Sequence, residues 1–297
     1  MHSRIKSAAF SVAMLFILSS PVIFASCSRG KGPAHESRVK ILSSFYPLHV
    51  MLLNITDGID GVSLSTLDES GCIHGRELKP GELESIISCD IFVANGLGME
   101  SYMDRVIEVK GDAVIDASEG YDCMDGNPHV WLSVDGAMYQ VLEITAGLSR
   151  LDPERSEEYM KNASSYINRL LKLSVKMQSE LESYAERKVV SFHEAFSYLF
   201  RELNLVESAY VRAESGIRPS DAEMDALVAL ISGLRKKGQV PVLFYGPQYT
   251  VASDIVSEET GLKLWELDAC VSGPMKKDSY VKSMERNLKV LKSALKD

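Results

Sequence analysis

Short apolar runs alternate with amphipathic stretches along most of the chain after residue 38. Apolar, β-branched runs predict buried strands, and apolar positions three or four apart predict helices. The expected strands are 39–45, 62–67, 91–94, 113–115, 188–192, 240–245 and 262–267. The expected helices are 47–55, 80–88, 195–203, 220–237, 250–260 and 280–295. Buried strands that alternate with helices are typical of parallel sheets covered on both faces, so the pattern predicts an α/β fold.

A long uninterrupted helix is expected over residues 152–188. Asp152 and Pro153 supply an N-cap and a proline at the first helical position. Apolar or small residues then recur three or four apart at Tyr159, Ala163, Tyr166, Leu170, Leu173, Met177, Leu181 and Tyr184. A helix of about 35 residues would be roughly 50 Å long. A coiled-coil segment is the alternative, but the apolar stripe is confined to one helix. A rigid connection between two lobes fits the pattern better.

The order of these elements predicts two parallel-sheet α/β lobes joined by the long helix. The predicted N-terminal lobe is 38–150, the linking helix is 151–187 and the C-terminal lobe is 188–297. Ligands of such sheets collect outside the carboxyl ends of the strands. We therefore expect a ligand site in the cleft between the lobes.

The N-terminus predicts export from the cytoplasm. Arg4 and Lys6 precede an apolar run that ends in small residues before Cys27, and Pro21 interrupts the run. This is typical of a signal peptide, here residues 1–26, while an uncleaved anchor helix is the alternative.

Cys27 is the expected site of lipid attachment. It follows Ala25 and Ser26, as in a bacterial lipobox, although Phe24 stands where that pattern usually has leucine. Residues 27–37 are polar, contain Gly and Pro, and predict a flexible tether. We thus expect an extracytoplasmic lipoprotein, anchored to the membrane at the cell surface or in the periplasm.

Composition limits the class of ligand. The chain has 297 residues, of which 45% are apolar and 25% charged, as in globular proteins. Lys and Arg total 32 against 41 Asp and Glu, which gives a net charge of -9. This charge repels phosphate backbones and no basic stripe is present, so nucleic acid is excluded as a partner. A cationic ligand is compatible with this negative net charge.

Four cysteines follow Cys27 in the chain: Cys72, Cys89, Cys123 and Cys270. In an exported protein they could form two disulfides, in any of three pairings. Free thiols are the alternative, and the apolar surroundings of Cys89 favour a buried one there.

Three histidines follow strands or lie in loops: His74, His129 and His193. Asp268 similarly follows the strand 262–267, whereas His49 lies within an apolar helix and is expected to pack in the core. Three imidazoles and a carboxylate form a donor set suited to Zn²⁺ and able to hold Mn²⁺ or Fe²⁺. The wide spacing excludes a zinc finger and fits one ligand per loop. Spacing alone does not distinguish such a site from unrelated histidines.

Two segments resemble the ZnuA- and TroA-like periplasmic metal-binding proteins of ABC importers. They are Asn127-Pro128-His129-Val130-Trp131-Leu132 and His193-Glu194-Ala195-Phe196-Ser197-Tyr198, and the similarity extends from Val39 to the C-terminus. The resemblance implies two lobes joined by a backbone helix, with a divalent metal held between them by His74, His129, His193 and Asp268. It also implies delivery of the metal to a cognate ABC transporter permease, by a protein that we expect to be a monomer.

The chain departs from the family pattern at several positions. Cys72 and Ile73 replace the usual Asp-Pro before the first histidine, Ala269 replaces a proline, and Gly246 replaces a glutamate. No histidine-rich loop is present. Cys72 and Cys270 each lie two residues from an expected ligand, so packing, a disulfide and thiolates near the metal are all open at this point.

The expected function is capture and delivery of a divalent transition metal, without catalysis. Zinc is favoured over manganese because manganese members often carry Glu where this chain has His193. A surface adhesin or siderophore-binding protein on the same two-lobe shell is the alternative. A zinc-dependent hydrolase using Glu194 or Glu266 as a base ranks last, since no H-E-x-x-H motif occurs and a four-ligand site lacks an open position.

Overall fold

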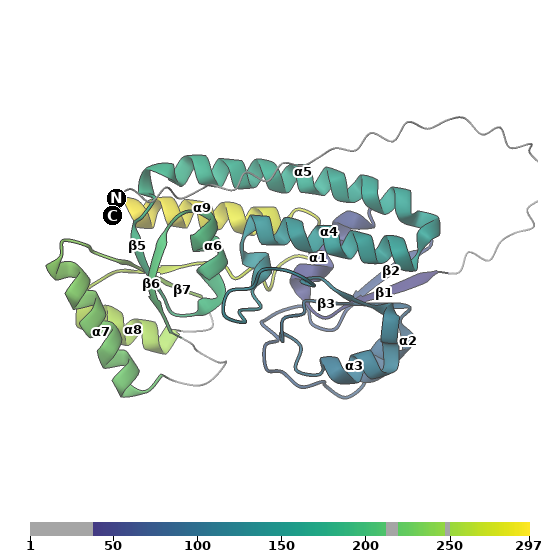
Figure 1. The fold of residues 1–297 in the computed structure, drawn as a ribbon, viewed down its shortest axis with the longest axis horizontal. Coiled ribbons are helices and arrows are strands. Elements are labelled where there is room, and N and C mark those ends of the chain that lie inside the picture. The colour runs from purple at the N-terminus through teal and green to yellow at the C-terminus, as the bar shows by residue number, and fades with distance from the viewer. Residues whose placement is uncertain (1–37, 212–218, 247–249) are drawn as a thin grey trace, which may run out of the picture. The chain divides into compact units, whose positions relative to one another are not determined.

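The strands form two four-stranded parallel sheets in the residues that the computed structural model describes, 38–211, 219–246 and 250–297 (Figure 1). The first sheet has the order β2-β1-β3-β4. Its strands are β1 (Val39–Ser43), β2 (Val62–Thr66), β3 (Ile91–Ala94) and β4 (Val114–Asp116). The second repeats this order as β6-β5-β7-β8. Its strands are β5 (Lys188–Ser191), β6 (Val206–Tyr210), β7 (Val242–Tyr245) and β8 (Leu264–Glu266). The predicted α/β class with two parallel sheets is confirmed.

The register places apolar residues side by side at the centre of each sheet. In β1, Ile41 pairs with Leu64 on one side and Ile91 on the other. In the second sheet, Val190 of β5 pairs with Leu243 of β7. In each sheet the direction in which successive strands are added changes next to the strand that comes first in sequence. This change falls between β1 and β3 in one sheet and between β5 and β7 in the other. Crevices at the carboxyl ends of such strand pairs are the usual ligand sites of open α/β sheets.

Nine α-helices lie among the described residues. They are α1 (Tyr46–Ile55), α2 (Glu82–Ser88), α3 (Met103–Lys110), α4 (Val134–Leu151), α5 (Ser156–Leu181), α6 (Ser197–Glu202), α7 (Asp221–Lys236), α8 (Thr250–Thr260) and α9 (Ser279–Lys296). Helix α7 begins with the capping box that its sequence contains, in which Ser220 and Glu223 bond to each other's backbone N–H groups. None of the described helices is long and apolar enough to cross a membrane.

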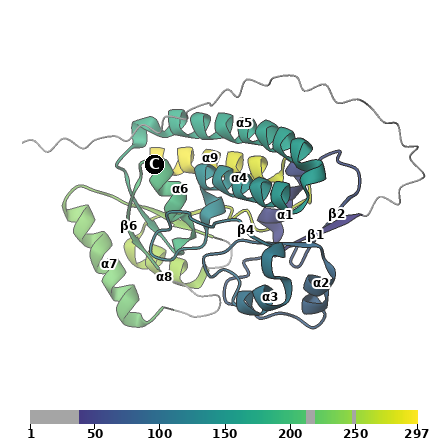
Figure 2. The same ribbon diagram turned by 45° about the vertical axis from the view of Figure 1, so that its right-hand side comes forward.

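The long helix is shorter than predicted. Helix α5 covers Ser156–Leu181, and 3₁₀ turns at Pro153–Arg155 and Glu182–Tyr184 extend it at both ends. Its predicted apolar stripe is buried from Tyr159 to Leu181. It packs against α4 and α9, which lie alongside it in Figures 1 and 2. A continuous core joins both sheets through these three helices.

Helix α4, α3 and strand β6 were not expected from the sequence. The buried face of α4 includes Gly136, Gln140 and Thr145, which interrupt the apolar pattern. Strand β6 lies at a sheet edge and places Glu207 between half-buried residues. Small or polar residues on the buried face of α4 and a charged residue in the edge strand β6 therefore concealed these two elements.

The expected signal peptide 1–26, the lipid-bearing Cys27 and the tether 27–37 lie outside the described residues. The described body belongs to one compact unit, residues 37–297. The lobe boundaries at 150 and 188 stay predictions.

The Glu202 side chain of α6 forms hydrogen bonds to the first residue of α4 and to helix α5. Its carboxylate accepts hydrogen bonds from the N–H of Val134 at 2.7 Å and from the hydroxyl of Ser174 at 2.8 Å. Burial, together with the nearby carboxylate of Asp135, raises the pKa of Glu202 to about 7. The folded protein therefore binds this proton more tightly than the unfolded chain does, and stability falls as pH rises from about 4.5 to about 7.

We expect Glu202→Gln to remove this pH dependence. The glutamine carbonyl can accept the same N–H bond but carries no charge. Between pH 6 and pH 8 the wild type should lose about 1 kcal/mol of unfolding free energy relative to the variant. Urea unfolding at both pH values measures this, with the exposed Glu157→Gln of α5 as control. Parallel losses in wild type and Glu202→Gln would contradict the assignment.

Candidate metal centre

Three histidine rings from separate loops meet beside the two sheets. His74 follows β2, His129 follows β4 and directly precedes a 3₁₀ turn at Val130–Leu132, and His193 follows β5 after one residue. The His129 and His193 ring centroids are 4.7 Å apart, and those of His74 and His129 are 6.1 Å apart. His129 is 1% exposed and His193 is 5% exposed, whereas His74 lies at the surface. The structure thus brings together three of the four predicted ligands.

These separations suit a zinc ion. Zn–N bonds of about 2.0 to 2.1 Å at tetrahedral angles place two imidazole centroids about 5 Å apart. The pair His129–His193 fits this spacing, and His74 would need to approach by about 1 Å. Among the described residues, no three His, Cys, Asp or Glu side chains are already arranged to hold a metal ion. Binding would therefore require a small closing movement, centred on the exposed His74.

Asn127 fixes the orientation of the His129 ring. Its Oδ1 accepts from the backbone N–H of His129 at 3.0 Å and lies 2.8 Å from the ring Nδ1. Its Nδ2 donates to the carbonyl of Glu194 at 2.7 Å, which fixes the amide orientation. Since Oδ1 can only accept, Nδ1 carries the ring proton and Nε2 carries a lone pair. Such a partner for the outer nitrogen is a regular feature of metal-binding histidines.

Burial keeps the two inner imidazoles neutral. It lowers the pKa of His129 well below its usual value, and the neighbouring His193 and His74 lower it further. It lowers the pKa of His193 to about 4, again with a contribution from His74. A neutral imidazole is the form that binds a metal, so both rings are ready ligands at neutral pH.

The Asp268 carboxylate is held by hydrogen bonds to residues outside the histidine cluster. Its Oδ2 accepts from Arg286 of α9 at 2.6 Å, and its Oδ1 accepts from the backbone N–H of Cys270 at 2.8 Å. The neighbouring Ala269 carbonyl accepts from the Trp131 indole at 3.0 Å, which ties this loop to the segment of His129. No described contact joins the Asp268 carboxylate to the histidine rings. Its role as a ligand stays a prediction.

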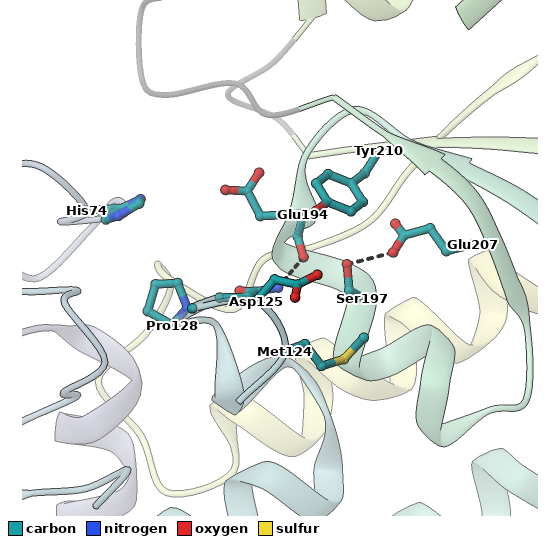
Figure 3. A pocket seen from close by; sticks show the side chains of 10 residues that line it. His74, Met124, Asp125, Pro128, Glu194, Ser197, Glu207 and Tyr210 are labelled. Carbon is teal, nitrogen blue, oxygen red and sulfur yellow. Dashed lines mark hydrogen bonds between the residues drawn. The ribbon is translucent and has the colours of Figure 1, made fainter. Parts of the chain in front are cut away.

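An acidic cavity of about 170 Å³ opens beside the cluster. Figure 3 shows His74 on one side of it and Glu194, Ser197, Glu207 and Tyr210 on the other. Glu194 Oε2 lies 3.8 Å from His193 Nε2. Glu207 accepts from the Ser197 hydroxyl at 2.6 Å, and burial raises the pKa of its carboxyl. Carboxylates along this opening favour the approach of a cation.

All four cysteines of the described body are free. Cys270 is buried, with its sulfur 3.7 Å from that of Met284, so it packs in the core. Cys89 is buried as expected, and Cys123 is exposed. Cys72 lies at the histidine cluster, with its sulfur 3.8 Å from His129 Nε2.

Sequence reasoning missed the supporting residues of this site. Asn127 stands two residues before His129, a position suited to orienting it, but this role depends on a turn that spacing does not show. Glu207 and Tyr210 belong to β6, which was not expected. His49 is a buried residue of α1, as its apolar neighbours indicated.

The fold and site define a two-lobe metal-binding protein of the solute-binding class. Residues 41–294 match the family described as "Zinc-uptake complex component A periplasmic", ZnuA. The chain belongs to this family, which confirms the resemblance inferred from its motifs. The family is one of metal-transport components and is not an enzyme family.

Individual relatives are similar over most of the chain. The high-affinity zinc uptake system protein ZnuA of Bacillus subtilis is 25% identical over 97% of each chain. The zinc-binding lipoprotein AdcA of Streptococcus pneumoniae is 25% identical over 95% of this chain, which spans 60% of AdcA's length. The Pseudomonas aeruginosa solute-binding protein FpvC, solved with Ni²⁺, is 28% identical with a TM-score of 0.77, over 87% of this chain and 97% of its own.

Proposed function

We propose that this protein captures a divalent transition metal outside the cytoplasm and delivers it to the permease of an ABC importer. His74, His129 and His193 bind the metal together with a fourth ligand, a position for which the resemblance indicates Asp268. The metal is cargo, so no bond is made or broken in the transported species and no catalytic step is included.

One observation carries the proposal most directly: three imidazoles from three loops meet at the sheet ends, and the inner two are buried. Burying polar rings costs free energy unless they gain partners. Asn127 satisfies one nitrogen of His129 and leaves the other turned towards the cluster. A metal ion at the cluster would bind that nitrogen in place of its contact with the Cys72 sulfur.

Location and partners follow from the N-terminal sequence and the family. We propose cleavage before Cys27, lipid attachment to that residue and retention on the membrane surface as a monomer. AdcA, one of the relatives, is itself described as a lipoprotein. A polar tether of residues 27–37 would let the body reach the permease from its anchor.

Zinc is the proposed cargo. Nitrogen-rich sites bind Zn²⁺ more tightly than Mn²⁺ in the Irving–Williams order. We expect stoichiometric zinc to displace manganese from the purified protein at neutral pH, in a competition titration followed by elemental analysis after desalting. Calcium, which prefers oxygen ligands, serves as the control and should displace neither metal. Retention of manganese in excess zinc would contradict the assignment.

A further inference from the structure

Cys72 faces the coordinating nitrogen of His129. Its sulfur is 3.8 Å from Nε2, the nitrogen that carries the lone pair because Nδ1 is bonded to Asn127. His129 is 1% exposed, so water has little access to that nitrogen. Cys72 is itself half-buried and two residues from His74. Sulfur and imidazole nitrogen therefore lie at the same side of the cluster, supplied by two different loops.

Their separation suits coordination of one ion by both atoms. Zn–N bonds of about 2.0 to 2.1 Å and a Zn–S bond of about 2.3 Å, at a tetrahedral angle, place nitrogen and sulfur about 3.6 Å apart. The observed distance is 3.8 Å. The change needed is therefore about 0.2 Å, smaller than the approach needed from His74.

Asp268 is less available than Cys72. Both of its carboxylate oxygens accept hydrogen bonds, from Arg286 and from the backbone of Cys270. Moving it to the histidines would break a charge-assisted pair. Cys72 has no ion pair to break, and it stands two residues before His74, where the family usually carries the Asp of an Asp-Pro pair.

We propose that the Cys72 thiolate is the fourth metal ligand, in place of Asp268, beside His74, His129 and His193. This rests on the proposed function, in which the histidine cluster is the metal site. On binding, a metal–sulfur bond forms and the thiol proton passes to water. A thiolate is a soft donor that suits zinc and disfavours manganese, so Cys72 also sets the choice of metal.

Cobalt(II) tests the proposal, because a thiolate bound to cobalt gives intense charge-transfer absorption in the near ultraviolet. We expect the full chain loaded with cobalt to show this absorption together with visible bands. Cys72→Ser should lose the ultraviolet absorption, keep the visible bands and bind zinc about 100-fold more weakly. Cys270→Ser, the matched control, and Asp268→Asn should keep both sets of bands.

The outcomes separate this proposal from the proposed function. Visible bands without charge transfer in the wild type, or charge transfer that survives in Cys72→Ser, would overturn the role of Cys72 but leave the histidine site intact. Absence of all cobalt bands would overturn both. Alkylation of the wild type adds a test that needs no variant. Zinc should protect Cys72 and leave the exposed Cys123 as reactive as before, whereas equal reactivity of Cys72 with and without zinc would contradict the proposal.

Discussion

Replacing His129 or His193 with alanine is expected to lower the affinity for zinc by about two to three orders of magnitude. Closed four-ligand zinc sites contribute about 10 to 16 kcal/mol, or roughly 2.5 to 4 kcal/mol for each donor. Both rings are buried, held at a fixed centroid separation of 4.7 Å, and neutral at pH 7. Isothermal titration with a competing chelator measures the change.

His49→Ala is the matched control for these variants. His49 is 8% exposed, so its truncation also removes a buried imidazole, but from helix α1 instead of the cluster. We expect its zinc affinity to equal that of the wild type. Circular dichroism should show the same helix content in all three variants. Wild-type affinity in both His129→Ala and His193→Ala would show that the metal binds elsewhere.

The largest effect on stability is expected for Trp131→Ala. Trp131 is fully buried and contacts Phe45 edge to face at a centroid distance of 5.0 Å. Its indole N–H bonds to the Ala269 carbonyl, and its own carbonyl accepts from Tyr280 of α9 at 2.8 Å. Removing a buried aromatic side chain of this size costs about 3 to 5 kcal/mol. Urea unfolding, followed by far-ultraviolet circular dichroism, measures the loss.

Trp265→Ala provides the comparison, since the chain has two tryptophans. Trp265 lies on β8, is only partly buried and is covered on one face by Lys263 at 3.6 Å from the ring centroid. Its replacement should cost much less than that of Trp131. Equal losses of unfolding free energy in the two variants would mean that Trp131 does not anchor the core between the sheets.

The two parallel sheets could be predicted because their central strands are short, largely apolar runs. Each of β1, β3, β5 and β7 was recognised from such a run. Strand β6 was not, because an edge strand tolerates a charged residue such as Glu207. Helix α4 was missed for a related reason, since Gly136 and Gln140 on its buried face break the apolar period. Gly136 lies against Val130 and Ser133, and Gln140 donates hydrogen bonds to Asn95 and Ser118.

The candidate site could be predicted only in part. His129 and His193 stand in distinctive segments, and both are found in the cluster. The contacts of Asp268 and Cys72 depend on side-chain direction. The direction of the Asp268 carboxylate depends on its ion pair with Arg286, which helix α9 supplies 18 residues further along the chain. The arrangement of Asn127 likewise depends on its bond to the carbonyl of Glu194, a long-range contact that the spacing of residues does not reveal.

The central claim is that one divalent metal binds at the histidine cluster. The most direct measurement is the stoichiometry of zinc bound by metal-free protein, determined by elemental analysis after gel filtration, for wild type and for the double variant His129→Ala/His193→Ala. The structure predicts one zinc ion per wild-type chain and none retained by the variant. Equal zinc retention by the two proteins, or no retention by the wild type, would contradict the claim.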